Sequence, residues 1–164
     1  MPSNYKEHFV SNIPPEALAE SLARSKAMKV AKMYEDKITI GADTIVSLDD
    51  KFFGKPKNNQ ESFEMLRSLS GKSHEVITGV SLILLSKNID YSFNQKTIVT
   101  LSNITDEEIL KYIKKFNPID KAGSYGIQDG FSVFIKNISG CYFNVVGFPL
   151  SKFFHQYKTI FKSL

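Results

Sequence analysis

The chain has little of several residue types, and each shortage narrows the classes of protein to which it can belong. Its 164 residues include no tryptophan and a single cysteine, Cys141. No internal disulfide can form, which fits a reducing compartment. No apolar run approaches the ~18 residues that a membrane-spanning helix needs, and the N-terminus MPSNYKEHFV lacks the hydrophobic core of a signal peptide. A cytoplasmic protein without a membrane segment is therefore predicted.

Patterns of metal ligands and nucleophiles are also scarce. The three histidines, His8, His74 and His155, are far apart and show no zinc spacing. Neither a Ser-His-Asp nor a Cys-His arrangement can be placed, and the Gly-Lys-Ser at 71–73 lacks the glycine five residues upstream that a phosphate loop requires. Any metal should then be a hard cation held by carboxylate and phosphate oxygens.

What is present is the composition of an ordinary globular domain. Hydrophobic residues make up 42% and charged residues 23%, which is normal for such proteins. No repeat or linker divides the chain, so one domain over 1–164 is expected. The net charge of +4 comes from scattered lysines. It suits an anionic small molecule as well as nucleic acid and decides neither, and a solvated surface explains it equally well. Without a basic stripe, no nucleic-acid partner is predicted.

Helical and strand patterns alternate along the chain. Helices are expected over 14–34, 59–69, 105–116 and from 149 onward, with Leu18, Leu22 and Met33 on the apolar face of the first. Strands are expected over 37–48, 52–53, 74–85, 91–101 and 131–138. Thr105 and Glu108 have the spacing of a capping box. Because strands and helices interleave, the predicted class is α/β with a mixed sheet.

One candidate site lies in GADTIVSLDDKFFGKP, residues 41–56. Asp43 sits among apolar residues of a predicted strand, where an unpaired carboxylate is costly to bury. Thr44 follows it, and a tight turn at 49–51 brings Lys55 back toward the strand. A carboxylate beside an ammonium can activate water near a bound phosphate. A buried ion pair at a hairpin is the simpler structural interpretation of the same spacing.

A second candidate is DKAGSYGIQ, residues 120–128. Its small residues permit close approach of the backbone to a ligand. Gln128 offers both a donor and an acceptor, which suits the edge of a nucleobase. A turn-rich connection before the next strand explains the segment equally well.

Taken together, five segments resemble the Maf family of nucleoside triphosphate pyrophosphatases and follow its order. They are ARSKA at 23–27, GADT and GKP at 41–44 and 54–56, LSGKSHEVITG at 69–79, KAGSYGIQ at 121–128 and YFNVVGFPL at 142–150. The resemblance implies an elongated, twisted mixed sheet with flanking helices and a cleft between two lobes, as in the related ITPase-like folds. It implies hydrolysis of a nucleoside triphosphate to the monophosphate and pyrophosphate with a divalent cation, Mg²⁺ or Mn²⁺.

The resemblance also implies roles for individual residues. Asp43 corresponds to the general base and to a ligand of the metal. Ala-Asp-Thr with Gly-Ile-Gln is similar to the subgroup that acts on dTTP and UTP. The residues expected to bind substrate are Thr44, Lys55, Gln128, Lys26, Lys72 and Lys121.

The chain departs from the family pattern at its start. The family begins with an apolar strand and a Ser-x-Ser-Pro-Arg-Arg loop, which are not found here, and the only arginines are Arg24 and Arg67. Arginine forks bind phosphate bidentately, so their loss is expected to weaken the grip on a triphosphate. A domain shortened at the N-terminus relative to the family is expected. Its unpaired sheet edge would favour a homodimer.

Two further departures alter charge near the expected site. Asn117 stands where the family has glutamate, and Asp129 stands where it has glycine after Gln128. The sequence therefore supports a dTTP/UTP pyrophosphatase, or one acting on modified pyrimidine nucleotides. The alternative is a catalytically impaired Maf-like protein that binds nucleotide or a partner without turnover. A third hypothesis is a shortened chain whose folded state depends on an oligomer.

Overall fold

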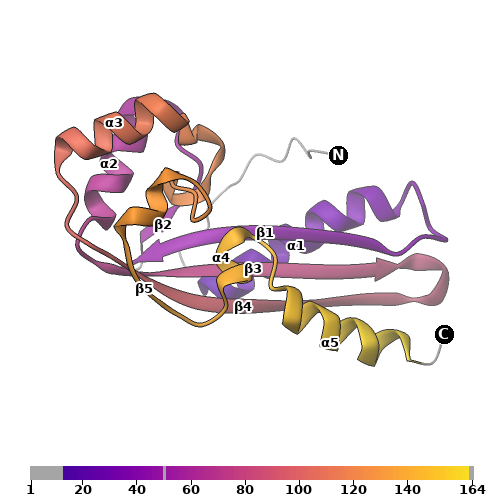
Figure 1. Ribbon diagram of the computed structural model, residues 1–164. Helices are drawn as coiled ribbons and strands as arrows, with labels where there is room; N and C mark the ends of the chain where they lie inside the picture. The colour runs from indigo at the N-terminus through magenta and orange to yellow at the C-terminus, as the bar shows by residue number, and fades with distance from the viewer. Residues whose placement is uncertain (1–12, 50, 163–164) are drawn as a thin grey trace.

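The molecule is elongated and built on one long twisted sheet (Figure 1). The computed structural model describes residues 13–49 and 51–162. The strands lie in the spatial order β2-β1-β3-β4-β5, with bounds β1 Thr39–Leu48, β2 Lys51–Phe53, β3 Ser73–Leu84, β4 Ile89–Leu101 and β5 Ile135–Ser139. Every strand pairing in the described chain is antiparallel. The α/β class is confirmed, and the prediction of a mixed sheet is wrong.

The sheet is antiparallel because each connection returns to the end of the sheet that it left. Asp49, with φ 49°, turns the chain from β1 into β2, and Asn88, with φ 53°, closes the turn between β3 and β4. Parallel neighbours need a crossover, usually a helix packed along the sheet. The helices that follow β2 and β4 instead gather at one end of the sheet (Figure 1). Interleaved helices therefore did not imply parallel strands here.

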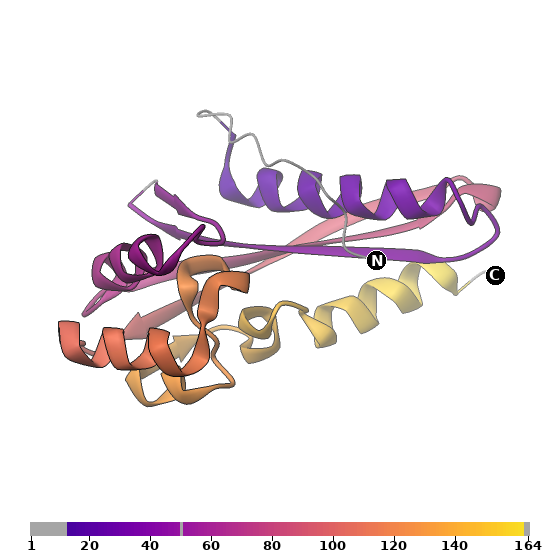
Figure 2. The same cartoon turned by 90° about the horizontal axis from the view of Figure 1, so that it is seen from above.

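Helices cover both faces of the sheet. Their bounds are α1 Pro15–Ala31, α2 Asn59–Leu69, α3 Asp106–Phe116, α4 Tyr142–Val146 and α5 Leu150–Phe161. Figure 2 shows α1 and α5 on opposite sides of the strands, and α2 and α3 at one end. In the described part of the chain, no helix combines the length and apolar character that crossing a bilayer requires.

Most predicted element bounds are confirmed, with three corrections. The capping box is present, since the Thr105 N–H donates to Glu108 Oε2 at 2.8 Å. α1 ends at Ala31, so Met33 lies beyond its apolar face and is exposed. The strand predicted from Phe131 begins at Ile135, after a 3-10 helix over Gly130–Phe134. The short helix α4 was not predicted.

Helix α1 approaches the sheet closely at two positions where the strands carry glycine and the helix carries alanine. A Cβ on Gly41 would lie 2.4 Å from the carbonyl oxygen of Ala23, and one on Gly79 would lie 2.2 Å from that of Ala19. These two glycines are on neighbouring strands, β1 and β3. Main chain of helix and sheet therefore meet without an intervening layer of large side chains.

The opposite face and the far end of the sheet carry larger side chains. Phe153 and Tyr157 of α5 pack against Val80 and Phe93. At the end covered by α2 and α3, the core includes Phe131, which is fully buried. Between these two clusters, Thr44 of β1 lies opposite Thr78 of β3.

The outer edge of β1 is open over much of its length. β2 pairs only with residues 46–48 of β1, while β3 pairs with 39–47 on the other side. Within residues 13–49 and 51–162, no strand pairs with the outer edge from 39 to 45. A homodimer through this edge stays a prediction, because no second copy is present.

The glycine contact yields a test of stability. We expect Gly79→Ala to lower the free energy of unfolding by about 3 kcal/mol, the upper range for overpacking. The added methyl group meets backbone atoms of Ala19 and Glu20, which cannot turn away. Urea unfolding measures the loss. Gly130→Ala is the matched control: its methyl meets only the ring tip of Phe116, so its loss should be clearly smaller. Equal losses would contradict the close main-chain contact.

His74 yields a test of pH dependence. Its side chain is 2% exposed, and burial lowers the pKa of His74 from 6.5 to about 4. The unfolded chain therefore takes up a proton below pH 6.5 that the folded chain refuses until about pH 4. Stability should fall across this window by about 3 kcal/mol. Urea unfolding at pH 7 and pH 4.5 should show this slope in the wild type and the exposed control His155→Gln. It should shrink in His74→Gln, and an unchanged slope there would contradict the assignment.

Candidate active site

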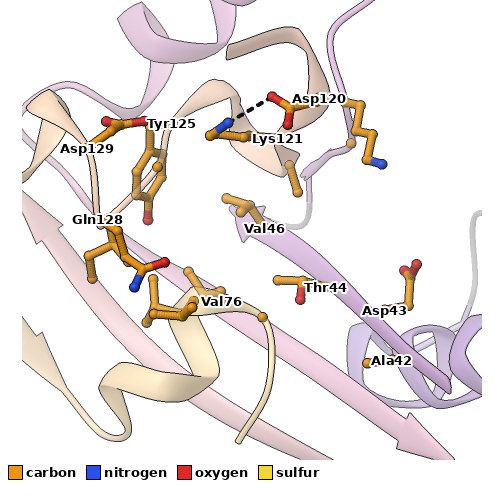
Figure 3. A pocket seen from close by; sticks show the side chains of 18 of the residues that line it. Ala42, Asp43, Thr44, Val46, Val76, Asp120, Lys121, Tyr125, Gln128 and Asp129 are labelled. Carbon is orange, nitrogen blue, oxygen red and sulfur yellow. Dashed lines mark hydrogen bonds and ion pairs between the residues drawn. The ribbon is translucent and has the colours of Figure 1, made fainter. Parts of the chain in front are cut away.

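A cavity of about 610 Å³ opens at the free edge of β1, where β2 stops. Figure 3 shows Asp43 on one side of it and Gln128 on the other, with Thr44 between them. Its wall comes from β1, the loop after β2, the 3-10 region after α3, and α4. Six of the seven predicted site residues line it: Lys26, Asp43, Thr44, Lys55, Lys121 and Gln128. Segments more than eighty residues apart in sequence thus meet at one cavity.

Asp43 lies on the α1 side of β1, and its side chain is 8% exposed. The strand neither ends nor bulges at this point, because the register with β3 is unbroken from 39 to 47. The Lys26 ammonium of α1 donates a hydrogen bond to Asp43 Oδ1. This ion pair offsets the cost of burying the carboxylate. It exists because the close contact of α1 carries Lys26 to the strand.

Thr44 points to the opposite face of β1, as alternation along a strand requires. Its Oγ1 lies 2.9 Å from Thr78 Oγ1 on β3. The Thr78 hydroxyl donates to the carbonyl of Asn144 at 2.9 Å, so its single proton is used. The Thr44 hydroxyl must therefore donate to Thr78, which leaves its oxygen as an acceptor at the cavity.

Buried polar contacts fix α4 at the base of the cavity. The Asn144 amide donates to the Val76 carbonyl and to Thr97 Oγ1, both at 2.9 Å. Asn144 is fully buried, and such networks hold one arrangement strongly. They place Val145, Val146 and Gly147 in the cavity wall. The sequence interpretation assigned no role to these residues; the polar Asn144 in an otherwise apolar YFNVVGF was the available signal.

The charges in the cavity nearly balance. Three lysines and three aspartates line it: Lys26, Lys55, Lys121, Asp43, Asp120 and Asp129. Lys121 Nζ donates to Asp120 Oδ1 at 2.8 Å, shown dashed in Figure 3. This hydrogen bond is the main reason that the pKa of Asp120 is lowered. Lys55 forms no ion pair with any described residue within 4.0 Å, so its ammonium is available to a ligand.

Lys72 and the two arginines lie outside the cavity. Lys72 precedes β3 and does not line the cavity, so the structure does not bring it to the other predicted site residues. Neither arginine lines the cavity. Arg24 Nε donates to Asp90 at 3.0 Å, and Arg67 lies 2.9 Å from Asp106.

The donors around the cavity fit a hard cation only in part. No group of three His, Cys, Asp or Glu side chains that could hold a metal occurs among the residues that the structure describes. Asp43 supplies one carboxylate at the cavity. Mg²⁺ commonly takes one or two protein carboxylates and completes its shell with substrate phosphates and water. The arrangement thus suits a cation that arrives with a phosphorylated ligand.

Comparison with known proteins agrees with this geometry. The chain is 44% identical over 156 residues to a dTTP/UTP pyrophosphatase of Carboxydothermus hydrogenoformans, covering 95% of this chain and 83% of the relative. It is 45% identical over 156 residues to a protein of the same name from Bacillus mycoides, with 95% and 81% covered. A third such protein, from Clostridium botulinum, is 48% identical over 134 residues, with 81% and 71% covered.

The family itself follows from a match over nearly the whole chain. The sequence model of the Maf-like proteins matches residues 1–160. This span includes all five segments by which the sequence resembled the family and every element that lines the cavity. The chain therefore belongs to the family of Maf-like proteins.

Proposed function

We propose that this protein hydrolyses dTTP and UTP to the nucleoside monophosphate and pyrophosphate. The observation that carries the proposal is one cavity with Asp43 at one side, Gln128 at the other and three lysines in its lining. Its relatives at 44–48% identity are named dTTP/UTP pyrophosphatases. The volume of about 610 Å³ lies within the range of small-ligand sites. The cytoplasm, where nucleoside triphosphates are made and consumed, is the compartment that this reaction needs.

The balance of charge supports a divalent cation in the reaction. A triphosphate is polyanionic, yet the lysines of the cavity are matched in number by aspartates. Binding a triphosphate there needs more positive charge than the described lining residues supply. We propose that Asp43 would hold Mg²⁺ or Mn²⁺ together with phosphate oxygens. The cation would supply charge stabilisation at the phosphorus under attack.

The side chains have distinct tasks in this proposal. Asp43 accepts a proton from the attacking water, and Lys26 keeps its carboxylate oriented. Lys55, free of ion pairs in the described chain, binds the phosphates with Lys121. Gln128 reads the base at the far side. In-line attack needs a positioned water and preorganised positive charge, and these groups supply both.

A second function is favoured by the placement of the arginines. Both are engaged with aspartates away from the cavity, so bidentate phosphate contacts from arginine are absent among the described residues. A protein that binds nucleotide without turnover would have this arrangement. Binding of UTP without pyrophosphate release by the wild type would select it.

The assignment of Asp43 predicts the main loss of activity. Asp43→Asn keeps the size of the side chain and removes the base, so we expect kcat for UTP and dTTP to fall about a thousandfold. Pyrophosphate release with Mg²⁺ or Mn²⁺ measures it. Asp36→Asn, whose side chain is 72% exposed, is the matched control and should keep wild-type rates. Full activity in Asp43→Asn would show that another residue is the base.

The different places of two lysines predict different losses. Lys55→Gln removes a free ammonium from the cavity, and we expect kcat/KM for UTP to fall about a hundredfold. Lys72→Gln removes the same charge outside the cavity and should change kcat/KM by less than about twofold, as distant surface charges do. Steady-state kinetics of both variants decides. Similar losses of kcat/KM in both variants would show that Lys72 also contributes to the site.

A further inference from the structure

Gln128 stands on a tight turn that is held from outside the cavity. The turn spans 126–129, and the Asp129 N–H lies 3.4 Å from the Gly126 carbonyl. Gln128 is exposed to the cavity, whereas Ile127 beside it is buried. Gln128 is one of the two central residues of this turn. The position of the amide therefore depends on what holds the two ends of the turn.

The hydroxyl of Tyr112, on α3, joins these two ends. It accepts a hydrogen bond from the Gly126 N–H at 3.1 Å and donates one to Asp129 Oδ2 at 3.1 Å. Asp129 Oδ1 accepts from the Phe131 N–H at 2.9 Å. Both carboxylate oxygens are thus engaged. From the sequence, Asp129 was interpreted as a negative charge near the expected site. In the structure, its carboxylate helps to hold the turn.

Neighbouring contacts make this support rigid. The Tyr112 ring stacks on Phe116 with centroids 5.2 Å apart and meets Phe131 edge-on at 4.9 Å. Burial raises the pKa of the Tyr112 phenol, so the hydroxyl keeps the proton that it donates. A Cβ on Gly126 would lie 2.4 Å from Asp129 Oδ2. The carboxylate therefore packs directly over the start of the turn.

The position of the turn matters for recognition of the nucleobase. Uracil and thymine present a carbonyl acceptor beside an N–H donor, and guanine presents the same pair at its O6 and N1. A glutamine amide matches either pattern. It cannot separate UTP from GTP by hydrogen bonding alone. The two bases differ in how far this edge lies from the sugar, because guanine has a second ring.

We propose that Tyr112 is a positioning residue whose hydroxyl fixes the 126–129 turn, and that the fixed distance of Gln128 makes the site select pyrimidine over purine nucleotides. The inference rests on the proposed function of the same cavity. Tyr112 does not line the cavity and acts through Gly126 and Asp129.

The test uses equilibrium binding, so that turnover does not enter. Calorimetry is done with the α,β-imido analogues of UTP and GTP, which cannot be hydrolysed between the α- and β-phosphorus, each with Mg²⁺, on the wild type and on Tyr112→Phe. The phenylalanine keeps the ring contacts and removes the hydroxyl. We expect the preference for UTP over GTP to fall about tenfold, the effect of one well-placed hydrogen bond. Tyr91→Phe, which loses an exposed hydroxyl bonded to Gln156 at 2.8 Å, should keep the preference.

A double-mutant cycle identifies the partner. Asp129→Ala should lower the same ratio, and adding Tyr112→Phe to it should lower the ratio little further, because both changes break one link. A general loss of stability weakens both nucleotides alike and does not move the ratio. An unchanged ratio in Tyr112→Phe overturns the proposal. Failure of the wild type to release pyrophosphate overturns the proposed function alone, and failure of both nucleotides to bind overturns both.

Discussion

The approach of α1 to the sheet is the constraint on which the rest of the site depends. Gly41 and Gly79 leave no room for a β-carbon against the main chain of the helix. The helix can therefore lie close enough for Lys26 to reach the carboxylate of Asp43. The same contact buries Ala23 and Ala27 completely or nearly so. The Asp43 carboxylate is tolerated inside an apolar strand because the close packing of α1 on the sheet brings Lys26 to it as a counter-ion.

The cavity lies at an edge of the sheet and not on one of its faces. β1 is paired on one side throughout and on the other only at its end, so consecutive residues on it reach the same opening from opposite faces. Asp43 takes its partner from α1, and Thr44 takes its partner from β3. One strand thereby places a carboxylate and a hydroxyl at the same cavity. A site in the middle of a fully paired sheet would present only alternate residues.

Local patterns predicted much of this fold, and the failures have physical causes. The helix at 59–69 and the capping box at Thr105 follow from short-range rules and were correctly placed. The mixed sheet was wrongly predicted, because the direction of a connection depends on where distant helices pack. Asp43, Lys55 and Gln128 were found from residue type and resemblance, and the structure brings them to one cavity. Lys72 was predicted as a site residue because it lies in a segment that resembles the family. Its position before β3 keeps it out of the cavity.

The sequence did not reveal the residues that hold the cavity wall in place. Asn144 and Tyr112 are held by contacts to residues far away in the chain, and neither has a local pattern that distinguishes it from a packed core residue. Asp129 was interpreted from its charge alone. Its hydrogen bonds to Tyr112 and Phe131 explain why a carboxylate is stable at this position in the cavity wall. Such roles become visible only when partners are known in three dimensions.

The buried bonds of Asn144 also bear on synthesis of the protein. α4 closes the cavity, and it is fixed there by partners on β3 and β4 that precede it in the chain. During synthesis, the strand that carries Asp43 and Thr44 is therefore made before the part of the wall that α4 supplies. A ligand of the cavity can therefore stabilise the fold only after α4 has been made and has docked on these strands.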